Sequence, residues 1–516
     1  MIQISSLTRL SDNSDRVAIH GQKLFPPYTE LGWDQGAFGL GDVDIENVSQ
    51  VAHIASYGRP LYAVFLPPLR PWTNLVVVRR WLSLKTALKL PRRLLRTASS
   101  KLCGGDTFDA SKTSHVLGVL GQRFGLNVTF GHPDSVEHLE NGVASHLRIC
   151  LATTLDRNWR FTSYPSEPLL SCVAATDLHE NPELEVALTT LLNAVNSGMI
   201  DVSQRGELAS RLLWLLAKAL FIRTQAEVVK EMPSTWEEHL IDCEMIPVAD
   251  WLEFIFGPQI WDEEDTQPSL ARDSFKDGYL NFSHWVCMEA NIAGSEEGSE
   301  LELVFLNCSS QHDLESDSLP CSLYEWTLRH WQRTSGVQCC HLQPLIDKVI
   351  PIYFKGGSES ATAESRMSQI FISDKARESK PSKEALSNIT RRNKTLSGKD
   401  DSDVKDSGCL PYIAILADLG QPSSLSVTFT ERNTRDRCLR IYAAGIDTTT
   451  YPFLATYPAL MKTLQNLVYL QQIPERETPV REYLLAQVKF GSTATPEHML
   501  WEHGKTVPAL RRKPAV

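Results

Sequence analysis

The chain lacks several patterns that would assign it to a class of protein. No apolar run reaches the roughly 18 to 20 residues that a membrane-spanning helix requires. The N-terminus has no basic segment followed by an apolar core, so we expect no secretory signal. The 11 cysteines form no C-x-x-C pair, which argues against a zinc ribbon and a secreted disulfide framework. We therefore expect reduced thiols and an intracellular protein, in the cytoplasm or the nucleus.

A phosphate-binding loop is also missing. No stretch reads G-x-x-x-x-G-K-[ST]. The nearest string, residues 104–113, has the wrong spacing and no second glycine before its lysine. We therefore expect no ATP as a partner and no ATP hydrolysis.

Acidic residues are absent between Asn47 and Gly105, although the formal net charge of the whole chain is -11. The basic residues of this segment include Arg79, Arg80, Arg92, Arg93 and Arg96. A basic surface of this kind can bind nucleic-acid phosphates or an acidic protein surface. An internal partner is an equally good interpretation, in which a basic helix packs on the acidic remainder of the chain.

The length of 516 residues predicts more than one domain. Residues 1–130 have the pattern of a helical unit with proline-rich joints, and residues 131–335 are predicted to be mostly helical. The pattern becomes β-rich over 336–490, with a polar, disordered insertion expected at 377–408. Residues 491–516 are expected to form a loose tail.

Hydrophobic periodicity and capping signals predict the individual elements. Helices are expected at 136–151, 182–198, 201–221, 247–256, 269–291, 322–333 and 458–470. Strands are expected at 337–342, 347–354, 368–374, 411–417 and 438–445. The fold class is therefore α/β (α+β), with a largely helical N-terminal half and a C-terminal mixed β-sheet flanked by helices.

Charged residues at the ends of two predicted strands suggest a hydrolytic site. Asp347 opens one strand and Lys375 closes the next, so neighbouring strands would bring a carboxylate and an ammonium together. Metal-dependent phosphodiester hydrolysis needs hard oxygen ligands for Mg²⁺ and a cation near the attacking water. Ser373 shares the face of Lys375, whereas Asp374 points to the opposite face unless a β-bulge rotates it. Glu207 begins a helix that could cover the sheet and add a carboxylate.

Each of these residues also has a structural interpretation. In the first turn of a helix, the negative charge of Glu207 interacts favourably with the helix dipole, and its carboxylate can pair at the surface with Arg211. Asp347 can cap the start of its strand, and Lys375 can begin the solvated insertion. The alternative to a nuclease-like enzyme is thus an inactive interaction or regulatory module on the same scaffold.

Three strings, at residues 206–213, 281–285 and 338–351, resemble a large uncharacterised family that is expanded in basidiomycete fungi. That family is similar to crinkler and retrotransposon-hot-spot effectors, which couple an NTPase module to a C-terminal domain similar to PD-(D/E)xK nucleases. The resemblance covers residues 135–475. It implies a restriction-endonuclease-like sheet, preceded in residues 1–130 by a truncated remnant of the NTPase module.

The resemblance also assigns roles to individual residues. It implies that Glu207 and Asp347 hold Mg²⁺, that Lys375 is the catalytic cation, and that Asp374 or Ser373 completes the site. Ser373 departs from the family pattern, which has an acid or a glutamine two residues before the lysine. We therefore expect either a metal-dependent phosphodiesterase acting on DNA or RNA, or a degenerate relative of one.

Overall fold

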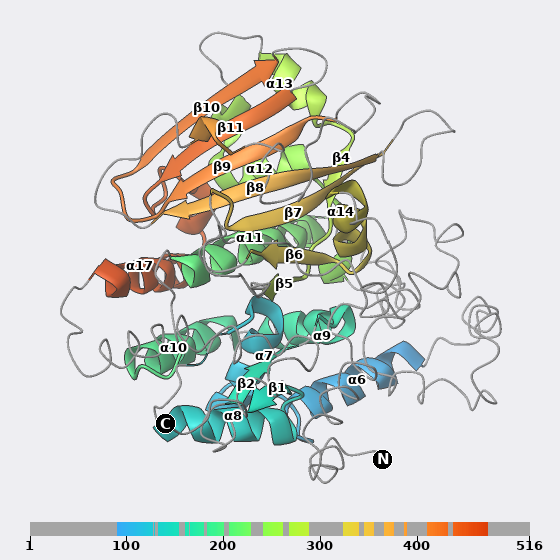
Figure 1. The fold of residues 1–516 in the computed structure, drawn as a ribbon, viewed down its shortest axis with the longest axis vertical. Coiled ribbons are helices and arrows are strands. Elements are labelled where there is room, and N and C mark those ends of the chain that lie inside the picture. Colours follow the sequence, from blue (N-terminus) through green and yellow to red (C-terminus); the bar gives the residue numbers. More distant parts are fainter. Residues whose placement is uncertain are drawn as a thin grey trace, which may run out of the picture.

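The fold is known from a computed structural model of the chain. The structure describes residues 90–126, 128, 133–153, 160–164, 166–179, 183–200, 206–228, 241–261, 268–287, 323–339, 345–355, 366–375, 386–389, 410–431 and 437–472. The expected tail and most of residues 1–130, including Arg79 and Arg80, lie outside the described residues. Within the described part, the protein is a mixed α/β fold, helical in its N-terminal half and with its sheet in the C-terminal half (Figure 1).

The N-terminal half is a layer of helices with a small antiparallel hairpin, at the bottom of Figure 1. Its elements are α6 (Leu90–Leu102), α7 (Thr113–Phe124), α8 (Pro133–Ser145), β1 (Ile149–Thr153), β2 (Arg160–Ser163), α9 (Pro168–His179) and α10 (Glu183–Asn196). The predicted helix at 136–151 is wrong at its end, because Leu147 has a φ of 60° that no right-handed helix accommodates. The chain turns there and enters β1.

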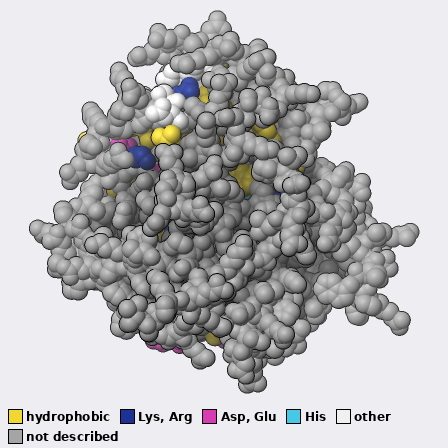
Figure 2. All heavy atoms as spheres, in the orientation of Figure 1, with side chains coloured by type: hydrophobic (Ala, Val, Ile, Leu, Met, Phe, Trp, Pro, Cys, Tyr) yellow, Lys and Arg dark blue, Asp and Glu magenta, His cyan; other side chains and the backbone are white. Residues whose placement is uncertain are grey.

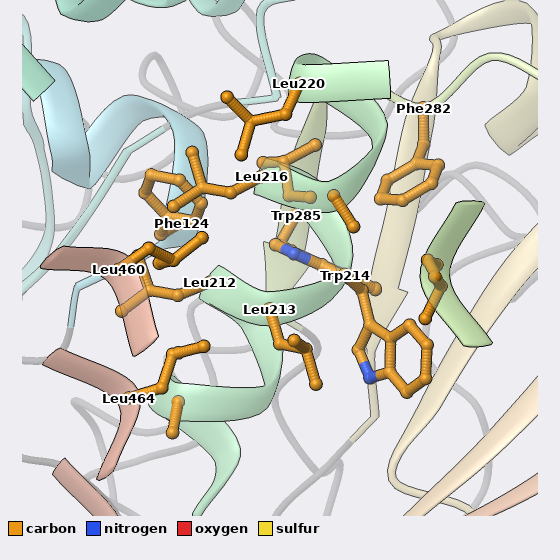
Figure 3. Packing of buried hydrophobic residues seen from close by; sticks show 14 of the residues in the cluster. Phe124, Leu212, Leu213, Trp214, Leu216, Leu220, Phe282, Trp285, Leu460 and Leu464 are labelled. Carbon is orange, nitrogen blue, oxygen red and sulfur yellow. The ribbon is translucent and has the colours of Figure 1, made fainter. Parts of the chain in front are cut away.

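Helix α11 (Glu207–Val228) lies between this layer and the sheet (Figure 1). It confirms the helix predicted at 201–221. Leu212 and Leu216 point toward Phe124 and α17 (Pro458–Gln472), whereas Trp214 lies on the opposite side of the helix (Figure 3). Residues 208–222 are buried on every side of the helix, and α11 is therefore the centre of the core.

The described part of the C-terminal half contains a mixed sheet of nine strands. They are β3 (Ile246–Pro247), β4 (Gly278–Leu280), β5 (His284–Cys287), β6 (Ser335–Gln338), β7 (Lys348–Phe354), β8 (Met367–Lys375), β9 (Tyr412–Asp418), β10 (Ser424–Glu431) and β11 (Arg437–Ala444). The main order is β10-β11-β9-β8-β7-β4-β3, and β6 pairs with both β7 and β5. Strands β7 and β8 are antiparallel, whereas β8, β9 and β11 are parallel.

Helices cover both faces of this sheet. The remaining described elements are η4 (Ile241–Cys243), α12 (Val248–Phe256), η5 (Pro258–Trp261), α13 (Pro268–Ser274), α14 (Leu323–Gln332), η9 (Pro452–Ala455) and α17 (Pro458–Gln472). One face packs with α11, α12 and α17 in the main core, and we call it the α11 face. The other, which we call the α14 face, carries Phe371 and Leu416 and packs against Trp326 of α14. Central strands buried on both faces read as continuous apolar runs, which explains why they were predictable.

Three expectations need correction. The predicted helix at 269–291 is only α13, because Gly278 ends the helical segment and the following residues pair as β4 and β5. Strand β10 was not predicted; its alternating pattern is that of a half-exposed edge strand. Within the insertion expected to be disordered, Ile389 is fully buried on the α14 face, packed with Leu386.

Candidate functional site

The ends of β7 and β8 bring four of the predicted residues together. Continuing the antiparallel register by one residue places Asp347 opposite Ser373. Ser373 and Lys375 share the α14 face with Asp347, and Asp374 points to the α11 face. The pairing of β8 with β9 runs without interruption through Asp374, so the β-bulge considered above does not occur there.

On the α14 face, the Asp347 carboxylate is held by donors from β8. Its Oδ2 accepts hydrogen bonds from the backbone N–H of Asp374 at 2.7 Å and from the Ser373 hydroxyl at 3.3 Å. The Lys375 ammonium lies 3.6 Å from the same oxygen. The side chain of Lys375 is 13% exposed and that of Asp347 is 5% exposed, so solvent reaches the edge of this ion pair.

On the α11 face, Asp374 forms a second ion pair that is completely buried. Its Oδ2 accepts a hydrogen bond from Lys348 Nζ, and its Oδ1 accepts one of 2.7 Å from Ser210 of α11. Burial raises the pKa of Asp374 to about 6 against the opposing effect of the Lys348 ammonium, and the nearby Asp347 carboxylate adds to the rise. Lys348 was not singled out from the sequence, although a lysine at the start of an apolar strand is an unusual core residue.

Glu207 begins α11 three residues before Ser210, and so lies near the α11 face. Within the described part of the chain, no hydrogen bond or ion pair joins its carboxylate to Asp347 or Lys375. The expected surface pair with Arg211 is also wrong. Arg211 is 1% exposed and donates to the backbone oxygen of Gly125 at 2.7 Å. The predicted site residues are thus divided between two faces of the sheet.

A further acid, Asp418, was missed in the sequence. It is paired in register with Lys375 at the end of β9, on the α14 face, and is fully buried. Burial and the Asp418 carboxylate together raise the pKa of nearby Tyr442. The sequence did carry a signal for Asp418, because it ends the apolar strand β9, and the preceding strand β8 ends in Lys375. Lys375 consequently lies on the strand between two strands that each carry an aspartate.

The carboxylates predicted to hold Mg²⁺ at the ends of β7 and β8 have other partners in the described residues. Magnesium favours octahedral oxygen coordination at about 2.0–2.1 Å. Here Asp347 Oδ2 already accepts two hydrogen bonds and forms an ion pair with Lys375, and Asp374 is bound by Lys348 and Ser210 on the opposite face. No group of three or more His, Cys, Asp or Glu side chains suitable for a metal is present in the described residues.

The predicted nucleic-acid-binding residues are only partly described. Arg92 and Arg93 lie in the first turns of α6, and Arg96 and Lys101 of the same helix are exposed. The helix packs through Ala98 against α9. That its basic side chains dock on the acidic remainder of the chain stays a prediction. On the face drawn in Figure 2, the described side chains that are visible gather mostly toward the upper part and mix apolar, basic and acidic groups.

A second buried ionic group, which we call the Asp242 cluster, consists of Asp242, Arg123, Lys218 and Arg223. Arg223 donates a hydrogen bond of 3.0 Å to each carboxylate oxygen of Asp242, and Arg123 Nη2 lies 3.6 Å from Asp242 Oδ1. Lys218 donates to the Asp242 backbone oxygen at 2.6 Å. Burial raises the pKa of Asp242, but the two arginines outweigh it and hold that pKa far below its ordinary range. Sequence reasoning missed this cluster.

The fold and these sites define a mixed α/β protein with two buried ionic centres. A family model described as "Domain of unknown function (DUF8736)" matches residues 107–243. That similarity covers about a quarter of the chain and includes all of the Asp242 cluster and Glu207, but neither Asp347 nor Lys375. No curated protein and no solved structure matches the chain. None of the described helices is long and apolar enough to cross a membrane.

Proposed function

We propose that this protein is a binding module built on a nuclease-like sheet and does not hydrolyse phosphodiesters. The observation that supports this proposal is the pairing of Asp347 with Lys375 and of Asp374 with Lys348. Asp347 and Asp374 each face a lysine, so a divalent cation at either carboxylate would meet an ammonium charge. Asp418 beside Lys375 adds a third carboxylate to the α14 face. A cation would have to displace an ammonium from its partner before it could bind.

The proposed partner is a nucleic acid, bound through its phosphates. Arg96 and Lys101 are exposed on α6, within the basic segment of this chain. This charge, and the resemblance to a nuclease-like family, favour a polyanion as the partner. Arg79, Arg80, Arg92 and Arg93 belong to the same basic segment of the sequence. An acidic protein surface is the alternative partner that this charge also suits.

A second candidate function is a metal-dependent phosphodiesterase, as the resemblance implies. The specific observation that favours it is the placement of Asp347, Ser373 and Lys375 on one face at the ends of two adjacent antiparallel strands. In this alternative Asp347 and Glu207 would be ligands of Mg²⁺, Lys375 would stabilise developing charge, and Asp374 or Ser373 would complete the site.

A cleavage assay distinguishes the two functions. We expect purified protein to leave mixed DNA and RNA substrates intact across a titration of Mg²⁺ or Mn²⁺, because the carboxylates are occupied by lysines. The assay compares the unmodified chain with Asp347→Ala, Lys375→Ala and the surface control Asp106→Ala. Metal-dependent cleavage that persists in the Asp106 variant and disappears in the other two would establish the nuclease and remove our proposal.

Nucleic-acid binding is tested with a charge reversal on α6. We expect Arg96→Glu to weaken the binding of a fluorescent oligonucleotide by about three- to tenfold, and to reduce the slope of log affinity against log salt by about one, as for a lost phosphate contact. Fluorescence anisotropy at several salt concentrations gives both values. Lys276→Glu, an equal charge change on an exposed lysine after α13, is the control. Equal weakening by both variants would mean that only net charge matters and that α6 is not the contact.

A further inference from the structure

Two cysteines that are far apart in the sequence meet in the core. Cys172 lies on α9 and Cys243 ends η4, and their sulfur atoms are 2.7 Å apart. That separation is less than 1 Å longer than a disulfide bond of about 2.05 Å. Both side chains are buried, in a small core shared with Ala98 and Leu169. The contact joins the helical layer to the segment that leads into the first strand of the sheet.

The surroundings of the two thiols are polar and asymmetric. Cys243 Sγ also forms a hydrogen bond of 3.3 Å with the Thr334 hydroxyl, and Lys218 lies near it, bound to the adjoining Asp242 backbone. Burial raises the pKa of Cys243, but hydrogen bonds from Cys172 and Thr334 and the Lys218 ammonium produce a net lowering. Burial and the hydrogen bond to Cys243 raise the pKa of Cys172. Cys243 is therefore the better nucleophile of the pair.

We propose that Cys172 and Cys243 are an oxidation site that closes to a disulfide when the protein meets hydrogen peroxide. The Cys243 thiolate attacks one peroxide oxygen, the O–O bond breaks, and the departing hydroxide takes up a proton to give water and a sulfenic acid. The Cys172 thiol then attacks the Cys243 sulfur and a second water leaves. Two thiols are oxidised by two electrons, and one peroxide is reduced to two waters.

The disulfide would close a loop of about 70 residues and tie α9 to the entry of the sheet. Restricting the unfolded chain in this way stabilises the native state. Peroxide is small and uncharged, so fluctuations of the fold suffice to admit it to a buried site. The crosslink does not depend on a nucleic-acid partner.

The test is peptide mapping by mass spectrometry of the full chain after graded treatment with hydrogen peroxide and quenching by alkylation. We expect a linked peptide containing Cys172 and Cys243, lost on reduction, and a rise in Tm of about 5 °C or more. In Cys172→Ser, Cys243 has no thiol partner and should proceed to sulfinic acid. The control Cys103→Ser removes a buried thiol whose pKa is raised to about 12, and should leave the linked peptide unchanged.

The linked peptide in the unmodified chain is a sufficient result by itself, so the proposal does not depend on the folding of any variant. Recovery of both cysteines as free or singly oxidised groups, at peroxide doses that oxidise the half-buried Met245 and Met461, would overturn it. A crosslink of either cysteine to a different one would do the same.

Discussion

Replacing Asp242 with asparagine should lower the free energy of unfolding by about 3–5 kcal/mol, the usual cost of removing one partner from a buried ion pair. Arg123 is fully buried and Arg223 makes two hydrogen bonds to this carboxylate. Asparagine preserves the size of the side chain but leaves both guanidinium groups without a counter-charge. Urea unfolding followed by circular dichroism, at neutral pH, measures the difference.

The matched control is Asp106→Asn, which removes an aspartate from an exposed pair with Lys112. Because exposed ion pairs contribute little, this variant should change stability by less than about 1 kcal/mol. A loss of similar size in the two variants would show that the Asp242 cluster is not a buried ionic centre.

The pH dependence of Asp242→Asn gives an independent readout from the same experiment. The pKa of Asp242 is depressed in the folded state, so its contribution to stability is present above the unfolded value of about 3.9 and is lost as the pH falls below it. The difference between the unmodified chain and the variant should therefore shrink below about pH 4. A difference that stays constant from pH 7 to pH 3 would contradict this assignment.

Replacing Lys348 with methionine should also lower the free energy of unfolding by about 3–5 kcal/mol near neutral pH. Lys348 and Asp374 are both fully buried, and methionine leaves the carboxylate with the Ser210 hydroxyl but without a cation. The folded pKa of Asp374, about 6 in the presence of the lysine, lies above the unfolded value of about 3.9. The stability that Asp374 contributes through its raised pKa is therefore fully present below about pH 4, and it is lost as the pH rises through the folded pKa.

Removing the lysine should raise that folded pKa further, because the ammonium lowers it in the intact protein. The stability deficit of Lys348→Met should accordingly be larger at pH 8 than at pH 5, which urea titrations at the two pH values measure. The double variant Lys348→Met with Asp374→Leu removes both charges and should recover much of the loss. A deficit that is independent of pH, or a double variant no more stable than the single one, would mean that packing dominates at this position.

The sequence was sufficient to predict the strands that hold the candidate site. Strands β7, β8 and β9 are short apolar runs bounded by polar segments, and period-two alternation predicted that Ser373 and Lys375 share a face opposite to Asp374. The encounter of Asp347 with Lys375 was also predictable, because neighbouring runs of this kind pair as antiparallel strands. Phosphodiester hydrolysis at the Asp347–Lys375 pair stays a prediction.

By itself, then, the sequence determined the fold class, the central strands and the charged residues at their ends, because these depend on local periodicity. Only the tertiary structure decided which charges meet: Lys348 with Asp374, Asp418 beside Lys375, and Arg123 with Asp242. Those pairings depend on the register between strands and on the packing of α7 and α11, elements that are distant in the chain. Local patterns carry no information on such register, and the buried ionic centres were therefore visible only in the folded protein.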